Sequence, residues 1–476
     1  MYALGPVDLR NEKRSKVCGR EGPWRGEDCS QRVEAGWWEI VDTELDEESS
    51  VSPSRTSHAA VADLSDMWVV GGEFLHRAPA DSMVSKWSME SREWGVVRSE
   101  GGRPPSERYG HSVVIHNNKI FMYGGVMRSG HVSKELWSFD LEAREWRREA
   151  PRTGRCLGDL CGEIHSAGHT ATVVQNRMIV IFGHSPQYGY LDTVQEYHFG
   201  NKEWGIIETR GYPVKGGYGH SAVLDEFTNL IFVYGGYISM SSSVAQLSNN
   251  LYSFEHQKGE WTMLRPSPSF RYLHSATMVR GLMLVFGGNT HNDTQYSQGA
   301  KCYSREFLAY DVLCDTWSSL DHTIPRDFSA DLDRFGHTAV SYNGSVYFYG
   351  GFNGQTKGDV VRFVPGRCQH VKDRESCVAV CCVRMGGELA EGADAAGECD
   401  EHVLRGDTRV IRKRREAALL DGALSSREEL EATVASMEAE WLPHGKKAEK
   451  SLRNFHDLSL HVAPLRVHFG AFVGKS

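Results

Sequence analysis

Short apolar runs that end in paired glycines recur along the chain and set the expected secondary structure. Each run is short, as in MWVVGG and VYFYGG, and none continues with the spacing of an amphipathic helix. The glycine pairs are Gly71-Gly72, Gly124-Gly125, Gly235-Gly236, Gly287-Gly288 and Gly350-Gly351, and Gly183-His184 is expected in the same place of a sixth copy. The pattern predicts a repeated unit of buried strand and tight turn.

Two further positions recur at fixed distances from the glycines. A histidine lies 13 to 15 residues before the first glycine of each copy, at His58, His111, His169, His220, His274 and His337. After the glycines, an aromatic residue precedes a tryptophan by seven positions in Trp87/Trp94, Phe139/Trp146, Tyr197/Trp204, Phe254/Trp261 and Tyr310/Trp317. Each copy therefore predicts four short strands, with the tryptophan covering the glycines of a neighbouring sheet.

Radial repetition of four-stranded sheets predicts an all-β protein, a six-bladed β-propeller. The sixth copy has Phe363 at the aromatic position but His370 where the tryptophan is expected. The missing outer strand is predicted at Trp38-Glu39-Ile40-Val41, which matches the tryptophan strands of other copies. An N-terminal strand would then complete the last blade and leave no open edge.

The glycine, tyrosine and tryptophan spacing resembles kelch repeats, and longer segments are more specific. GGYGHSAV, FGGNTHNDT and GAKCYSREFLAYDVLCDTW resemble the kelch propeller of the attractin family, which includes attractin-like and multiple-EGF-domain ectodomains. The resemblance runs from about Trp37 to Cys377. It implies a non-enzymatic, extracellular protein-interaction module within a receptor-regulating ectodomain, whose partners could include membrane receptors.

The flanks of the propeller depart from the family, and four regions are expected. Residues 1–35 resemble a remnant of an EGF module, 36–366 form the propeller, 367–382 resemble a truncated PSI module, and 383–476 form a disordered or partly helical tail. A capping box at Ser425 and Glu428 favours a local helix in the tail. An incomplete or misassembled gene model remains an alternative explanation of both ends.

Eleven cysteines, most of them near the ends or in close pairs, favour an oxidising compartment. Cys302 and Cys314 flank the third strand of blade five, and the attractin family has both, which implies a disulfide. Free or buried thiols are the alternative. Further disulfide candidates are Cys156 with Cys161 in one connection, Cys18 and Cys29 in the EGF-like remnant, and Cys368 and Cys377 in the PSI-like start. Zinc binding near Cys377 is the weaker interpretation because the spacing lacks two C-x₂-C pairs.

Two sequons indicate glycosylation. Asn292-Asp293-Thr294 is expected in an exposed loop, and the family resemblance extends to it. Asn343-Gly344-Ser345 is expected in a tight turn, where an unmodified turn asparagine is an equal alternative.

Charge and hydropathy exclude several classes of function. The 53 Lys and Arg against 62 Asp and Glu give a net charge of −9, which disfavours a nucleic-acid-binding groove. No uninterrupted apolar stretch is long enough to predict a transmembrane segment, and the first residues lack the apolar core of a signal peptide.

No catalytic, metal-binding or cofactor-binding residues are predicted. Six histidines at one repeat position are expected to spread around the ring in structural hydrogen bonds, whereas the ligands of a metal converge. A kelch-fold oxidase would need a tyrosine and histidine cluster at the centre with a cross-linked cysteine, and is a weak alternative.

Long connections are expected to gather on one face and to form the binding surface. Tyr237, Tyr296 and Arg305, in connections of blades four and five, are the candidate partner-binding residues. An intracellular, muskelin-like kelch adaptor with reduced cysteines is the second hypothesis.

Overall fold

The computed structural model describes the propeller region almost completely. The described residues are 24–25, 31–32, 36–42, 54–73, 83–153, 159–241, 244–279, 281–291, 303–312, 315–325, 328 and 330–366. All of them belong to the first of two compact units, Met1–Glu398.

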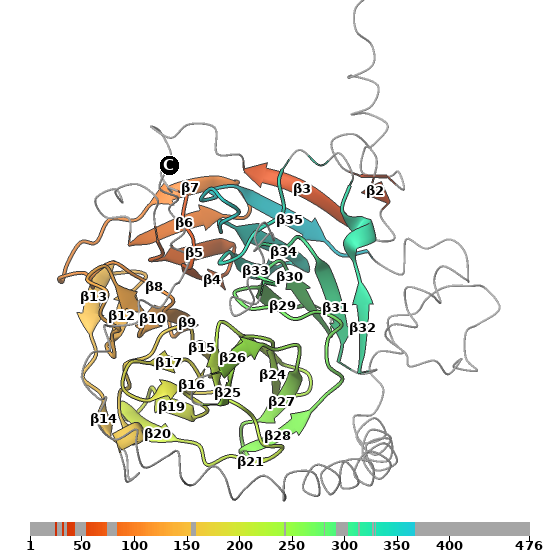
Figure 1. The fold of residues 1–476 in the computed structure, drawn as a ribbon. Helices are drawn as coiled ribbons and strands as arrows, with labels where there is room; N and C mark the ends of the chain where they lie inside the picture. The colour runs from red at the N-terminus through yellow and green to blue at the C-terminus, as the bar shows by residue number, and fades with distance from the viewer. Residues whose placement is uncertain are drawn as a thin grey trace, which may run out of the picture. The chain divides into compact units, whose positions relative to one another are not determined.

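Six antiparallel sheets form the blades (Figure 1). Blade one consists of β4 (Ala59–Asp63), β5 (Asp66–Val70), β6 (Val84–Ser88) and β7 (Glu93–Val96). Blade two consists of β9 (Ser112–His116), β10 (Lys119–Tyr123), β12 (Leu136–Asp140) and β13 (Glu145–Arg148). Blade three consists of β15 (Thr170–Val174), β16 (Arg177–Ile181), β19 (Val194–His198) and β20 (Glu203–Ile206). Blade four consists of β23 (Ser221–Asp225), β24 (Leu230–Tyr234), β27 (Leu251–Glu255) and β28 (Glu260–Met263). Blade five consists of β29 (Ser275–Val279), β30 (Leu282–Phe286), β31 (Phe307–Asp311) and β32 (Thr316–Ser319). Blade six consists of β33 (Thr338–Tyr342), β34 (Ser345–Tyr349), β35 (Val360–Val364) and β3 (Trp37–Asp42). The predicted six-bladed fold is confirmed.

Short elements lie between the blades or extend their edges. They are β1 (Trp24–Arg25), β2 (Gln31–Arg32), β8 (Arg108–Tyr109), β11 (Val126–Met127), β14 (Arg152–Thr153), η1 (Asp159–Cys161), β17 (His184–Ser185), β18 (Gly189–Tyr190), β21 (Arg210–Gly211), β22 (Gly217–Tyr218), β25 (Tyr237–Ser241), β26 (Val244–Leu247) and η2 (Asp321–Thr323). Strands β14 and β21 pair in parallel with β20 and β28, so the connection from one blade runs along the outer edge of the next.

The innermost strands follow one another around the ring in the order β4, β9, β15, β23, β29 and β33, and β33 lies beside β4 (Figure 1). The residue before each repeat histidine has a positive φ and donates its backbone N–H to the equivalent carbonyl of the preceding blade. The six bonds are Gly110 to Ser57, Gly168 to Gly110, Gly219 to Gly168, Leu273 to Gly219, Gly336 to Leu273 and Ser57 to Gly336, with N···O distances of 2.7 to 3.0 Å. They form a closed circle of hydrogen bonds, which we call the inner circle.

A second circle joins the glycine pairs to the next blade. The N–H of the second residue of each pair donates to the carbonyl three positions before the next histidine. The bonds are Gly72 to Arg108, Gly125 to Ser166, Gly183 to Gly217, Gly236 to Arg271, Gly288 to Arg334 and Gly351 to Arg55. Every junction between blades therefore contains the same two backbone hydrogen bonds.

The glycine pair of blade three lies one residue earlier than predicted. Strand β16 ends at Ile181, so the pair position is occupied by Phe182, with φ 55°, and Gly183, with φ 116°. The predicted Gly183-His184 pair is therefore wrong. The positive φ of Phe182 is unfavourable for a bulky residue, but its buried ring stacks on Trp261 at a centroid distance of 5.5 Å. The aromatic contact offsets the backbone strain.

The tryptophan of one blade packs on the residue beside the glycine pair of the preceding blade. Trp204 contacts Tyr123 at 4.8 Å, Trp317 contacts Tyr234 at 5.1 Å, and Trp94 contacts Tyr349 at 4.9 Å between ring centroids. Most of the core therefore lies between blades. Such contacts bury apolar surface only when adjacent blades are both folded.

Strand β3 completes blade six by pairing antiparallel with β35, in a register that sets Trp38 opposite Phe363. The Trp38 side chain is 0 % exposed and lies between the rings of Phe286, Phe307 and Phe348. Its Nε1 donates to Thr323 Oγ1 at 3.1 Å. One N-terminal side chain thus joins blades five and six.

We expect the Trp38→Ala substitution to lower the free energy of unfolding by about 3–5 kcal/mol, because it removes a fully buried indole and leaves a cavity. Trp37→Ala, on the same strand but partly exposed, is the control and should cost much less. Urea unfolding followed by circular dichroism measures both. Equal losses would contradict a closing role for Trp38.

Candidate interaction surface

Long connections leave the same end of every blade. The end of β10 pairs with the start of β9 and the start of β12, so connections from the second to the third strand and from blade to blade lie together. We call this end the loop face; its described connections include 97–107, 126–135, 184–193, 207–216, 237–241, 244–250, 264–270, 303–306 and 352–359. The opposite face carries tight turns, such as residues 64–65, 117–118 and 175–176.

Buried arginines stabilise the loop face in four of the six blades. Each lies three positions before a repeat histidine, and its Nη1 donates to the carbonyl of the first glycine of its own blade. The bonds are Arg55 to Gly71, Arg108 to Gly124, Arg271 to Gly287 and Arg334 to Gly350, at 2.8 to 3.2 Å. Burial lowers the pKa of Arg55 and of Arg108.

Three of these arginines also form ion pairs. Arg108 pairs with Glu135 at 3.2 Å, Arg334 pairs with Asp359 at 2.9 Å, and Arg271 pairs with Glu306. Each carboxylate directly precedes the third strand of its blade. A buried guanidinium needs such a partner because an unpaired buried charge is strongly destabilising.

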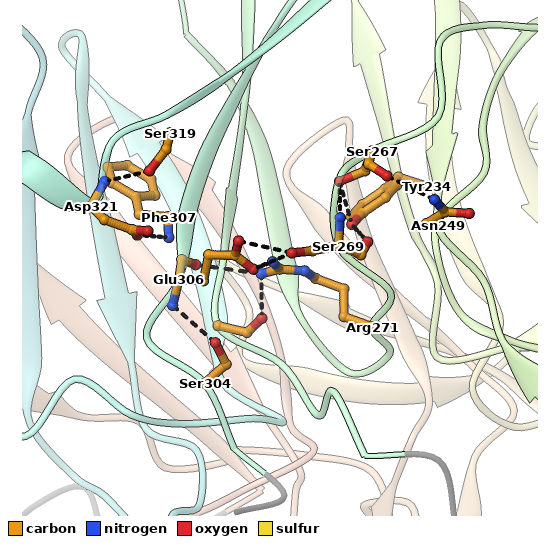
Figure 2. Close-up of polar contacts among 11 residues, drawn as sticks. Tyr234, Asn249, Ser267, Ser269, Arg271, Ser304, Glu306, Phe307, Ser319 and Asp321 are labelled. Carbon is orange, nitrogen blue, oxygen red and sulfur yellow. Dashed lines mark hydrogen bonds and ion pairs between the residues drawn. The ribbon is translucent and has the colours of Figure 1, made fainter.

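The network around Arg271 fixes the connection between blades four and five (Figure 2). Glu306 accepts hydrogen bonds from Arg271 and from Ser269 Oγ. Tyr234 Oη donates to the Ser269 carbonyl at 2.6 Å and lies 3.0 Å from Ser267 Oγ, within hydrogen-bond distance. These bonds hold residues 267–271 in place and leave the neighbouring Phe270 ring 51 % exposed.

Blades three and four lack the arginine and instead support a group of aromatic rings in contact with one another. Ser166 and Gly217 occupy the arginine positions. We define the tyrosine cluster as His184, Tyr190, Tyr218, Tyr237 and Tyr272, whose neighbouring ring centroids lie 5.3 to 6.2 Å apart. Burial raises the pKa of Tyr190 and lowers that of His184. The cluster joins blades three, four and five on the loop face.

The long connections around the tyrosine cluster contain short strands that pair with one another. Strands β17 and β18 form one hairpin, and β22, β25 and β26 form a three-stranded sheet. Tyr237 is 7 % exposed because Tyr218 and Tyr272 cover it. Tyr237 was predicted as a partner-binding residue, and that role stays a prediction; in the structure its ring lies beneath the surface.

Three exposed apolar side chains lie on the same segments of the loop face as members of the tyrosine cluster, and Tyr212, 42 % exposed, lies on the connection that leads to Tyr218. Tyr188 is 38 % exposed, Met240 40 % and Phe270 51 %, and all three lie on the loop face. On the opposite face, Leu64 and Phe227 are exposed by 85 % and 54 % in turns of different blades. Sequence reasoning missed Tyr188, Met240 and Phe270, although a tyrosine or phenylalanine between prolines, serines and glycines is the signal that identifies two of them.

The structure describes some of the other site residues predicted from the sequence, and the rest lie outside the described residues. Arg305 is exposed on the loop face, and Asn343 is exposed in the turn between β33 and β34, with φ 47°. Cys161 is buried in η1 and is disulfide-bonded; its predicted partner Cys156 lies outside the described residues, so the pairing stays a prediction. Also outside are Tyr296, Asn292, Cys18, Cys29, Cys302, Cys314, Cys368, Cys377 and the predicted regions 367–382 and 383–476.

The six repeat histidines link neighbouring blades. In five of them Nε2 bonds the hydroxyl that follows the histidine of the preceding blade, in the pairs His58–Thr338, His169–Ser112, His220–Thr170, His274–Ser221 and His337–Ser275, at 2.8 to 2.9 Å. Ala59 occupies that position in blade one, and His111 Nε2 bonds the Val70 carbonyl instead, at 3.1 Å. The rings thus point along the circle of blades.

Burial makes protonation of these histidines unfavourable. It lowers the pKa of His111 and His220 to about 3 and that of His169 to about 4, and it lowers the pKa of the other three well below the usual value. Their Nδ1 atoms are buried without a hydrogen-bond partner among the described residues, so the Nδ1–H of a protonated ring would lack an acceptor there. Within the same residues, no cluster of three His, Cys, Asp or Glu side chains has metal-binding geometry. No described helix is long and apolar enough to span a membrane.

A family model described as the attractin/LZTR1 β-propeller matches residues 67–361. Putative protein tag-53 of Caenorhabditis elegans is 32 % identical over 74 % of this chain, which corresponds to 26 % of that protein. Multiple epidermal growth factor-like domains protein 8 of Mus musculus is 27 % identical over 72 % of the chain and 12 % of its own length. The chain thus spans only a minor part of these two relatives.

One further curated protein and one solved structure are also similar to this chain. Kelch domain-containing protein 3 of Rattus norvegicus is 23 % identical over 66 % of this chain and 69 % of that protein. The solved structure of YjhT has a TM-score of 0.51 at 14 % identity and covers 66 % of this chain and 97 % of its own. That likeness supports the fold alone.

We expect the free energy of unfolding to fall as the pH drops below about 6.5, because the unfolded chain then binds protons that the folded histidines exclude. Each histidine adds a slope of about 1.4 kcal/mol per pH unit once its unfolded form is protonated. Urea unfolding at pH 7.5, 6.5 and 5.5 measures it. His169→Gln should reduce the slope of the unfolding free energy against pH by the contribution of one histidine. An unfolding free energy that does not change with pH across this range would contradict the conclusion that the folded chain keeps these histidines neutral.

Proposed function

The chain belongs to the attractin/LZTR1 β-propeller family, and from this premise we propose that its propeller binds a protein partner through the loop face. The observation that carries the proposal is the exposed apolar group of Tyr188, Met240 and Phe270 around the tyrosine cluster. Interface cores are enriched in aromatic residues and methionine and depleted of charged residues.

The surface around the tyrosine cluster has this composition. Segments 184–193, 211–218, 237–250 and 266–272 contain three charged side chains, Asp192, Lys215 and Arg271, and the last is buried. Rigid aromatic rings supply contact area at a low cost in conformational entropy. The role we propose is binding without catalysis and without a metal or cofactor.

We further propose an extracellular setting, with membrane receptors among the partners. The attractin/LZTR1 family match and the similarity to multiple epidermal growth factor-like domains protein 8 support it, as do the cysteine pairs and sequons. An intracellular kelch adaptor is the second candidate, favoured by the similarity to kelch domain-containing protein 3, of which this chain covers 69 %.

The double variant Tyr188→Ser, Phe270→Ser should lose at least tenfold in affinity for the partner, because it removes two exposed aromatic anchors. Proteins captured by proximity labelling with the secreted full chain are identified by mass spectrometry and purified, and binding is measured by surface plasmon resonance.

The matched control is Leu64→Ser, Phe227→Ser, which removes two exposed apolar side chains from the opposite face. It should bind like the unmodified chain. A loss of binding confined to the control variant would show that the partner binds the face opposite the loop face, and would contradict the proposal.

Expressed through a secretory route, the chain should contain a disulfide between Cys302 and Cys314, because such a bridge persists in an oxidising compartment. Peptide mapping without reduction detects it, and the same digests show whether Asn292 and Asn343 carry glycans. Alkylatable free thiols at both cysteines in secreted material would favour the intracellular adaptor.

A further inference from the structure

Blade three, the sheet of β15, β16, β19 and β20 in Figure 1, lies between the two junctions that lack a buried arginine. At the other four junctions an arginine three positions before the repeat histidine bonds the first glycine carbonyl of its blade. Ser166 and Gly217 occupy that position before His169 and His220. The Ser166 Oγ atom is buried and has no hydrogen-bond partner in the part of the chain that the structure describes. Both junctions of blade three therefore lack the charge-assisted bonds of the others.

His169 and His220 join blade three to its neighbours. His169 Nε2 lies 2.9 Å from Ser112 Oγ in blade two, and His220 Nε2, in blade four, lies 2.9 Å from Thr170 Oγ1 in blade three. His169 is 5 % exposed and His220 is 6 % exposed. A buried imidazole therefore crosses each junction of blade three.

Neither imidazole has a counter-charge that would stabilise its protonated form. The two rings face each other's charge, and the other titratable side chains that face them are uncharged or are repeat histidines, namely Tyr123, His111 and His274. No carboxylate of the described residues interacts with either ring, and both Nδ1 atoms are buried without a partner there. Burial lowers the pKa of His169 to about 4 and that of His220 to about 3. A protonated ring is therefore stable only in an opened junction.

The junctions of blade three and the tyrosine cluster share the same turns. Tyr218 lies two residues before His220, and Gly219 between them donates its N–H across the junction to the inner circle at 2.8 Å. His184 and Tyr190 lie opposite each other on β17 and β18. Directly before His184, the second circle joins blade three to blade four with an N–H···O distance of 2.8 Å. An opening of blade three would therefore separate part of the tyrosine cluster from the rest.

We propose that blade three opens in acid and thereby releases a partner bound at the loop face, with His169 and His220 each taking up one proton. The proposal rests on the proposed function and specifies how that binding is regulated. At pH 7.5 the neutral rings keep both junctions closed. As the pH falls below about 6.5, the usual pKa of an accessible histidine, the opened form binds protons that the closed form excludes. Between pH 7.5 and pH 5.5 each histidine favours the opened form about tenfold, and the two together favour it about a hundredfold.

Hydrogen exchange of the full chain at several pH values between 7.5 and 5.5 tests the opening without any partner. Mass spectrometry with fragmentation resolves the six amides of the inner circle singly. After correction for intrinsic exchange, the protection of the Gly168 and Gly219 amides should fall about a hundredfold over this range, which corresponds to the uptake of two protons. Unchanged protection would overturn the proposal. So would an equal fall of about a millionfold at all six amides, because the whole ring would then open at once.

Paired variants separate the histidines of blade three from those at junctions with a buried arginine. His169→Gln with His220→Gln keeps a side-chain N–H for the hydroxyl and stays uncharged, so the protection of those two amides should no longer depend on pH. His274→Gln with His337→Gln is the matched control and should leave their hundredfold fall unchanged. Each single variant of the first pair should retain a tenfold fall, which decides the matter if the double variant does not fold. An equal effect of both pairs would contradict a specific role of blade three.

Surface plasmon resonance with the partner obtained by proximity labelling connects the opening to binding. The partner should dissociate from the unmodified chain at least tenfold faster at pH 5.5 than at pH 7.5, and His169→Gln with His220→Gln should remove this difference. Equal dissociation rates at both pH values, with binding still lost in Tyr188→Ser, Phe270→Ser, would overturn the regulation and leave loop-face binding intact. A loss of binding confined to the opposite-face variant would overturn both the proposed function and its control by blade three.

Discussion

The inner circle of backbone hydrogen bonds is the constraint on which the rest of the propeller depends. Each blade contributes one N–H and one carbonyl at the residue before its histidine, and every donor finds its acceptor in the blade before it. All six residues have a positive φ, so each innermost strand begins with the same sharp turn. A bond lost at one junction would leave buried polar groups in two blades, which makes the ring cooperative.

The repeated junction also explains where the blades differ. Arginine and carboxylate stabilise the loop face at blades two, five and six, and Arg55 does so at blade one with Ser85 as its partner. Blades three and four replace this polar support by contacts between aromatic rings, at the same place where Phe182 takes a glycine position. Departures from a repeat pattern are expected at positions that also have a functional role. Here they coincide with the exposed apolar surface.

Much of the fold followed from sequence because glycine, histidine and tryptophan recur at similar distances and have the same physical role at most junctions. The closing strand at Trp38 was predictable for the same reason. That Phe182 takes the place of the first glycine in blade three could not be predicted, because only the strand pairing shows where β16 ends. The burial of Tyr237 was hidden as well, because its covering rings, Tyr218 and Tyr272, come from segments remote in the chain, and the hairpin of β25 and β26 has a serine-rich sequence without a glycine turn signal.

The pairing of β3 with β35 has a consequence for the order of events during synthesis. Glu39 and Arg362, which form an ion pair across these strands, are 323 positions apart. The strand that closes the ring therefore leaves the ribosome before any complete blade and finds its partner only after the last blade has been made. Until then its two tryptophans lack their final cover, which makes this segment a ready target for chaperones while the ring is still open.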